Sequence, residues 1–437
     1  MPSTRRSFLA TASLGIGALA GCVSLDSPEA TGSWPRRMTT NEHTGAGPTD
    51  GPTTDLHAVW QTERPVGPPG PVSPVVADGT LYLAYSPDQR AAEAGNASVE
   101  AFDAATGESR WTTDLPETGD GEVHSVSDSL VLDDDRLFVQ TKPGLTMLST
   151  DGELQWRVDN LDAGQPAPNV VPPVVTDDVV VTGSYDSQTT GSQVERLYGL
   201  DPETGDRLWR LGFPERVNMW QLSGTDDTVF VPFLRWGILA VDAVSGEERW
   251  RWRGPVMGAV TVTDDRLLVP VDPEDTQEGV VALDRSTRSV AWRQSLSPRG
   301  TESCLSVADG RVYCGAFGRV EALDVATGER LWQFGGGIDE DGSPTGVPLF
   351  SRETPVVSGS TVYAPGYIQR DTVHGHLYAL DAETGTERGR ARLGRNETAM
   401  TSTPAVTSDL VFVNSSRGVL RAFGECSVGV AGRCLVD

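Results

Sequence analysis

Lysine is nearly absent from this sequence of 437 residues: of its 35 basic residues only Lys142 is a lysine, against 61 Asp and Glu and a net charge of −26. So little basic charge argues against nucleic acid as a partner, because phosphate binding requires a basic face. The acidic excess is typical of a protein that works at very high salt concentration, where screening reduces the repulsion between surface charges. We therefore expect a halophilic protein, with an ordinary acidic secreted protein as the alternative.

The N-terminus has no apolar run that is long enough for a membrane-spanning helix, since Leu9 to Ala20 is short and rich in Gly and Ala. Arg5 and Arg6 lie in Thr-Arg-Arg-Ser-Phe-Leu, which resembles a twin-arginine export signal. The sequence Leu-Ala-Gly-Cys that ends at Cys22 resembles a lipobox. We predict that residues 1–21 are a signal and that Cys22 carries lipid. A plain cleaved signal with an incidental cysteine is the alternative.

Residues 22–54 lack apolar periodicity. They are rich in Ser, Thr, Gly, Pro and Asp, a composition typical of flexible linkers. We predict a tether that holds a folded domain near the membrane through the lipid. This prediction places the protein outside the cytoplasm, on the outer face of the cell membrane. Residues 425–437 are expected to form a short tail.

Cysteine is scarce, with five residues in the chain. If Cys22 carries lipid, two pairs remain: Cys304 with Cys314, and Cys426 with Cys434. Disulfides are plausible for both pairs in an exported protein, and free thiols are the alternative. Neither spacing is typical of zinc ligands.

One phrase recurs along the chain, and its copy at residues 320–332 predicts a strand, a tight turn and a second strand. Asp324 can accept hydrogen bonds from the N–H groups that follow it, and Gly328 supplies the positive φ that returns the chain. Trp332 carries a large apolar area that must pack outside its own hairpin. The copies are spaced by about 40 to 46 residues, which is typical of four-stranded propeller blades.

Two counts of the repeat agree on eight blades. Eight first hairpins are present, but only seven complete second hairpins, because the last is cut short near Phe423. The missing outer strand is predicted at residues 56–60, which would close the ring and remove open sheet edges. We therefore expect an all-β, eight-bladed propeller with four-stranded blades over residues 55–424. The repeat tryptophans are expected to pack between blades: Trp60, Trp111, Trp156, Trp209, Trp250, Trp292 and Trp332.

The phrase apolar-x-Ala-Leu-Asp-x-x-Thr-Gly-x-x-x-Trp resembles the repeat of the pyrroloquinoline-quinone (PQQ) propeller superfamily, and it covers residues 55–424. One branch of that superfamily contains dehydrogenases that hold PQQ and calcium at the ring centre. The other contains lipoprotein propellers similar to the scaffold subunit of the bacterial outer-membrane barrel-assembly machine. The dehydrogenases typically carry a disulfide between adjacent cysteines, and this chain has no Cys-Cys pair.

The resemblance therefore implies a membrane-anchored, non-enzymatic scaffold that binds other envelope proteins and acts as a monomer without a cofactor. One alternative is a dehydrogenase of alcohols or sugars that depends on PQQ and calcium. Another is a solute-binding or sensor propeller. The motif is specific for the fold and names no binding residue.

Few residues suggest a chemical site. His374 and His376 share one strand face and could hold a metal, although such histidines are usually solvated. The acidic runs at 272–278 and 339–343 offer oxygen ligands for calcium, but their spacing is not that of an EF-hand. Trp220 and Trp236, outside the repeat register, could line one end of the ring. We expect no catalytic residue and no metal ligand.

Overall fold

The computed structural model describes residues 28, 30–64, 72–86, 96–116, 126, 130–141, 144–158, 169–185, 195–213, 219–272, 279–296, 305–316, 318–338, 344–345, 349–350, 354–369, 373–395, 402–415, 417–426, 429–430 and 433–434. Strands and turns account for the regular structure of these residues. No helix among them is both long and apolar enough to cross a membrane. Arg5, Arg6 and Cys22 lie outside the described residues.

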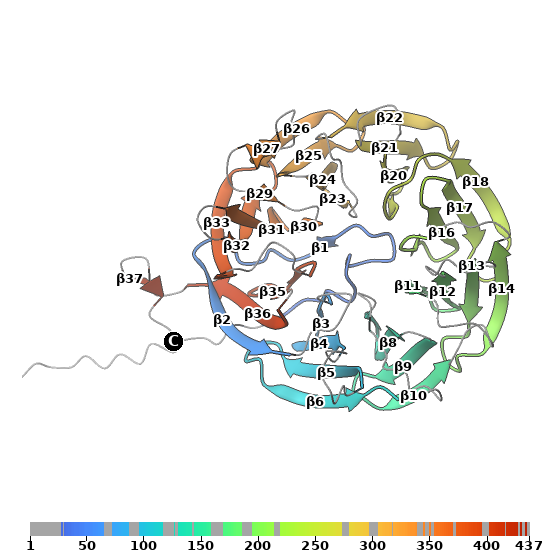
Figure 1. Ribbon diagram of the computed structural model, residues 1–437, viewed down its shortest axis with the longest axis horizontal. Helices are drawn as coiled ribbons and strands as arrows, with labels where there is room; N and C mark the ends of the chain where they lie inside the picture. Colours follow the sequence, from blue (N-terminus) through green and yellow to red (C-terminus); the bar gives the residue numbers. More distant parts are fainter. Residues whose placement is uncertain are drawn as a thin grey trace, which may run out of the picture.

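Eight four-stranded antiparallel blades form a ring (Figure 1), which confirms the predicted eight-bladed propeller. Blades are numbered here in chain order, each from its innermost to its outermost strand. Blades 1 to 4 are β3–β6 (Val75–Ala77, Thr80–Tyr85, Ser98–Asp103, Ser109–Asp114), β7–β10 (Val131–Asp133, Arg136–Thr141, Gly144–Ser149, Leu154–Val158), β11–β14 (Asn169–Val175, Val180–Tyr185, Glu195–Leu200, Arg207–Phe213) and β15–β18 (Ser223–Gly224, Thr228–Phe233, Gly237–Asp242, Glu248–Arg253).

The second half of the ring repeats this order and takes its last strand from the N-terminal end. Blades 5 to 8 are β19–β22 (Thr261–Val262, Arg266–Val271, Gly279–Asp284, Val290–Ser295), β23–β26 (Ser306–Ala308, Arg311–Ala316, Arg319–Asp324, Arg330–Gly335), β30–β33 (Val356–Ser358, Thr361–Gln369, Val373–Asp381, Glu387–Arg395) and β34–β36 with β2 (Ala405–Val406, Val411–Asn414, Val419–Glu425, Leu56–Glu63). Short strands complete the set: β1 (Ala46–Gly47), β27 (Gly337–Ile338), β28 (Pro344–Thr345), β29 (Leu349–Phe350), β37 (Gly429–Val430) and β38 (Arg433–Cys434). In blade 7, β1 and β29 extend the sheet to six strands.

Burial follows the position of a strand within its blade. In blade 4, β17 is buried from Gly237 to Val241, whereas β18 alternates between exposed and partly buried residues. A continuous apolar sequence suits the inner strands because a neighbouring blade covers each face, and alternation suits the outer strand. The core therefore lies between blades: Phe138 of blade 2 and Tyr198 of blade 3 belong to one buried cluster.

The repeat tryptophans link each blade to the next. In six of the seven, the indole N–H donates to a backbone oxygen of the following blade, and the ring packs against the turn glycine there. Trp60, for example, donates to Ala104 O at 3.0 Å and lies against Gly107. Equivalent bonds of 3.0–3.1 Å join Trp111 to Thr150, Trp156 to Pro202, Trp209 to Ala243, Trp292 to Val325 and Trp332 to Ala382.

Two positions break this pattern, and the structure explains both. Arg288 takes the place of the turn glycine in blade 5, with φ of 63°, and its guanidinium lies 5.7 Å from the centre of the Trp250 ring. Gly389 takes the place of the tryptophan in blade 7, where a Cβ would meet Thr53 O at 3.0 Å. A segment of the N-terminal chain therefore fills the space that a tryptophan occupies elsewhere.

The N-terminal strand closes the ring through β2, which pairs with β36 over Leu56–Glu63. Just beyond it, Arg64 forms a bidentate ion pair with the buried Glu100 of blade 1, at 2.5 and 2.6 Å. The same guanidinium lies 5.2 Å from the centre of the Phe102 ring. Blades 8 and 1 are thus joined by a charge-assisted bidentate pair as well as by the packing of Trp60.

The cysteines differ in part from the expectation. Cys314 is a buried free thiol, so of the two alternatives for Cys304 and Cys314 the disulfide is wrong. Its side chain faces the core between blades 5 and 6, where Leu268 and Val280 belong to the same cluster. Cys304 lies outside the described residues. Cys426 is disulfide-bonded, and the sequence predicts Cys434 as its partner.

We expect that Gly107→Ala lowers the free energy of unfolding by about 1–3 kcal/mol more than Gly79→Ala does. Both glycines have positive φ, 73° and 69°, so both variants carry backbone strain of about 1–2 kcal/mol. Only at Gly107 would the new Cβ meet a ring, 2.6 Å from Trp60. Denaturant unfolding of both variants checks this, and equal losses would show that the inter-blade tryptophans contribute little.

Candidate functional site at the ring centre

The ring centre is occupied by the chain itself. Residues 30–50, here called the inner belt, run around the inside of the ring, as the blue segment in Figure 1 shows. The sequence predicted a flexible tether over 22–54, and this is wrong for the described residues from 30 onward. The segment is held mainly by hydrogen bonds of its backbone, including the parallel pairing of β1 with β30. Such pairing does not depend on apolar side chains, so the composition of the segment did not indicate it.

The inner belt meets the blades in order. At an equivalent position of the innermost strand in blades 1 to 7, a backbone N–H donates to an oxygen of the belt at 2.7–3.3 Å. The bonds run from Val76 to Trp34 O, Leu132 to Pro35 O, Val175 to Asn41 Oδ1, Gly224 to Asn41 O, Val262 to Glu42 O, Val307 to Thr44 O and Val357 to Gly45 O. In blade 8, Ser408 N donates to Thr31 O at 2.9 Å.

Both ends of the belt lie at the same face of the propeller. Thr31 contacts the turn between the first two strands of blade 8, and the Asp50 carboxylate accepts from Ser360 N in the corresponding turn of blade 7. We call this the tight-turn face, because it also carries the Asp-x-x-Thr-Gly turns. Strands alternate in direction, so the connections between second and third strands and between blades lie at the other face, the long-connection face.

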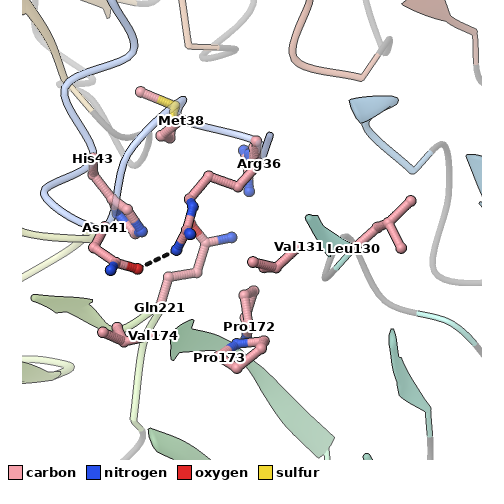
Figure 2. Close-up of a pocket in the computed structure, with 11 residues that line it drawn as sticks. Arg36, Met38, Asn41, His43, Leu130, Val131, Pro172, Pro173, Val174 and Gln221 are labelled. Atoms are coloured by element: carbon pink, nitrogen blue, oxygen red, sulfur yellow. Dashed lines mark hydrogen bonds between the residues drawn. The ribbon is translucent and has the colours of Figure 1, made fainter. Parts of the chain in front are cut away.

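A polar cluster lies where the belt passes blades 2 to 4 (Figure 2). The Arg36 guanidinium donates to Asn41 Oδ1, and the Asn41 amide donates in turn to Val175 O at 2.6 Å. His43, with φ of 60°, turns its ring toward Arg36. Arg36 Nε and His43 Nδ1 are both buried without a hydrogen-bond partner.

Burial determines the charges of this cluster. It lowers the pKa of His43 to about 3, and the nearby Arg37 and Arg36 charges act in the same direction. His43 is therefore neutral at physiological pH. Burial also lowers the pKa of Arg36, to about 10, although Asp133 and Glu42 act the opposite way. Arg36 keeps its charge, without a carboxylate in contact.

Trp220 and Trp236, two of the four tryptophans outside the repeat register, pack against different apolar clusters. Trp220 packs near the belt, in a cluster with Met38 and Ala259. Trp236 lies at the long-connection face, in the turn from β16 to β17. It contacts Phe233 edge to face, and the guanidinium groups of Arg251 and Arg253 lie 5.7 and 5.3 Å from its ring centre. The arginine pair on Trp236 could not be read from the sequence without the register of β18.

The residues that were considered as metal ligands make other contacts or lie outside the described residues. His376 Nδ1 is 3.0 Å from His374 O, and His374 Nδ1 is 2.8 Å from the guanidinium of Arg392. Asp272 pairs with Arg235 at 2.8 Å, whereas the rest of that acidic run and all of 339–343 fall outside the described residues. The part of the chain that is described contains no group of three His, Cys, Asp or Glu suited to a metal.

The eight blades with this repeat define a β-propeller of the PQQ-like type, in the quinoprotein-like superfamily. The chain belongs to the family described as outer membrane protein assembly factor BamB, whose model matches residues 54–232, 193–276 and 237–429. BamB of Burkholderia pseudomallei (strain K96243) is 23% identical over 392 residues, which cover 85% of this chain and 89% of that protein. The crystal structure of BamB from Moraxella catarrhalis matches with a TM-score of 0.57 and 18% identity, over 86% of this chain and 99% of that one.

Quinoproteins are also similar to parts of the chain. Quinohemoprotein alcohol dehydrogenase ADH-IIG of Pseudomonas putida is 36% identical over 124 residues, which cover 25% of this chain and 16% of that enzyme. The crystal structure of quinohemoprotein alcohol dehydrogenase from Comamonas testosteroni matches with a TM-score of 0.64 and 15% identity, over 93% and 82% of the two chains. At such identity the structural likeness shows the fold alone.

We expect that Asn41→Ala lowers the free energy of unfolding by about 1–3 kcal/mol, because it leaves Arg36 and both backbone groups of Val175 without their partner. Gln155→Ala is the control, since Gln155 is exposed and bonds only to its neighbour Glu153. Denaturant unfolding measures both. A loss no greater than that of the control would mean that the belt is not held by this contact.

Proposed function

We propose that this protein is a non-enzymatic scaffold of the cell envelope, which binds other envelope proteins through the long-connection face of its propeller. The family match along residues 54–429 supports this reading, because the named relatives are assembly factors. The observation that carries it is the inner belt. A quinone at the ring centre would compete for space with a segment that is hydrogen-bonded to every blade.

The positions of the two faces support the choice of surface. If Cys22 carries lipid, the chain runs from the membrane to Ala30, and it enters the ring at the tight-turn face. Eight residues span at most about 28 Å when fully extended. The tight-turn face is then held toward the membrane, and the long-connection face is left open to partners.

The Trp236 cluster is the most suitable docking point among the described residues of that face. Trp236 is partly exposed, and the exposed Arg251 and Arg253 lie over its ring. Tryptophan and arginine are enriched at the positions that dominate binding energy in protein interfaces. We therefore expect a partner to bury this ring.

Crosslinking in intact cells tests this expectation, with the partner identified by its co-purification with the full-length chain. Trp236→Ala should weaken the crosslinked complex at least about tenfold, as expected for a central interface residue. Leu208→Ala should leave it unchanged, because Leu208 is an exposed apolar residue on the outer strand β14, away from this face. Equal crosslinking of both variants would remove the Trp236 cluster from the proposal.

The second candidate function is a dehydrogenase that depends on PQQ and calcium, which the quinohemoprotein relatives favour. Titration of the purified protein with PQQ and calcium in multimolar salt separates the two functions. A scaffold should show no saturable quenching of tryptophan fluorescence and no dye reduction with alcohols or sugars. Saturable quenching with substrate-dependent dye reduction would overturn the scaffold proposal.

A further inference from the structure

A small cavity lies between the inner belt and blades 2 to 4. Its volume is about 20 Å³, and the residues that bound it include Arg36, Arg37, His43, Pro172, Pro173 and Gln221. Figure 2 shows the Arg36 side chain extending across this space toward Asn41, with the His43 ring beside it. A cavity of this size holds about one water-sized particle.

Among the described residues, no carboxylate contacts the positive charge that Arg36 brings to this cavity. Its guanidinium donates one hydrogen bond within the described part of the chain, to a neutral amide, Asn41 Oδ1. The acidic groups Asp133 and Glu42 act on Arg36 through space, and Asp133 is paired with Arg136 at 2.6 Å. Arg36 is partly buried, and a charge that is withdrawn from water without a counter-charge in contact is unfavourable.

Two buried donors on residues that bound this space have no acceptor among the described residues. Arg36 Nε is buried without a partner, and so is His43 Nδ1, which can carry the proton of a neutral imidazole. A water molecule could satisfy these hydrogen bonds but would leave the charge of Arg36 uncompensated. An anion would do both, and only a monatomic one matches the volume.

We propose that one small inorganic anion, of halide size, binds between Arg36 and His43 of the inner belt, in the cavity that the belt forms with blades 2 to 4. The site is independent of the scaffold proposal, since it concerns the belt and not the long-connection face. The belt brings Arg36 and His43 together only when it is seated against the blades that wall the cavity, so binding of the anion stabilises the assembled state over a state in which the belt has detached.

Bromide locates the site directly in the native protein. Crystals grown with sodium bromide in place of sodium chloride should show an anomalous difference peak within hydrogen-bonding distance of Arg36 Nε and His43 Nδ1. A cavity without such a peak, or with ordinary water density, would overturn the proposal. No variant is needed for this experiment.

Thermal unfolding tests the energetic consequence. At constant sodium concentration, replacing gluconate by chloride should raise the Tm of the native protein steadily with the logarithm of chloride concentration. Arg36→Gln should abolish this dependence, whereas Arg207→Gln, at an exposed position of β14, should keep it. Equal melting in both salts, or the same dependence in both variants, would contradict the site. If Arg36→Gln does not fold, the bromide peak and the native salt series still decide.

Discussion

The hydrogen bonds from the innermost strands to the inner belt are the constraint on which the rest of the structure depends. Each blade presents one open sheet edge to the ring centre, and in blades 1 to 7 an equivalent N–H of that edge donates to the belt. A belt that serves every blade must follow the curvature of the ring. The positions of its residues are therefore determined by the eightfold repeat around it.

This arrangement also explains how the N-terminal chain performs several tasks in sequence. It first lines the ring centre, then fills the space beside Gly389, and finally supplies β2 to blade 8. Arg64 ends this path on Glu100 of blade 1. One continuous segment therefore closes the ring. It makes hydrogen bonds to the innermost strands at the ring centre, packs beside Gly389 on the outside, and ends in a buried ion pair between blades 8 and 1.

The repeat could be predicted from the sequence because its residues act locally. Asp324 accepts from the N–H groups of Ala326 and Thr327, and Gly328 has φ of 75°, as the turn requires. The inner belt could not be predicted in this way. Its composition indicates a segment that cannot form a hydrophobic core of its own. Most of its hydrogen bonds to the blades use backbone N–H and C=O groups, which leave no mark on the sequence. Trp34 and Met38, both fully buried, were the available signal, since a solvated tether has no use for such side chains.

The path of the belt determines how it would respond to force. A pull on residue 30 from the tight-turn face loads the contact at Ser408 first, then the bond at Val76, and so on around the ring. The bonds break one after another, as in peeling, instead of sharing the load as strands under shear do. A modest tension could thus strip the belt from the ring while the blades, which are held by their tryptophans, stay assembled.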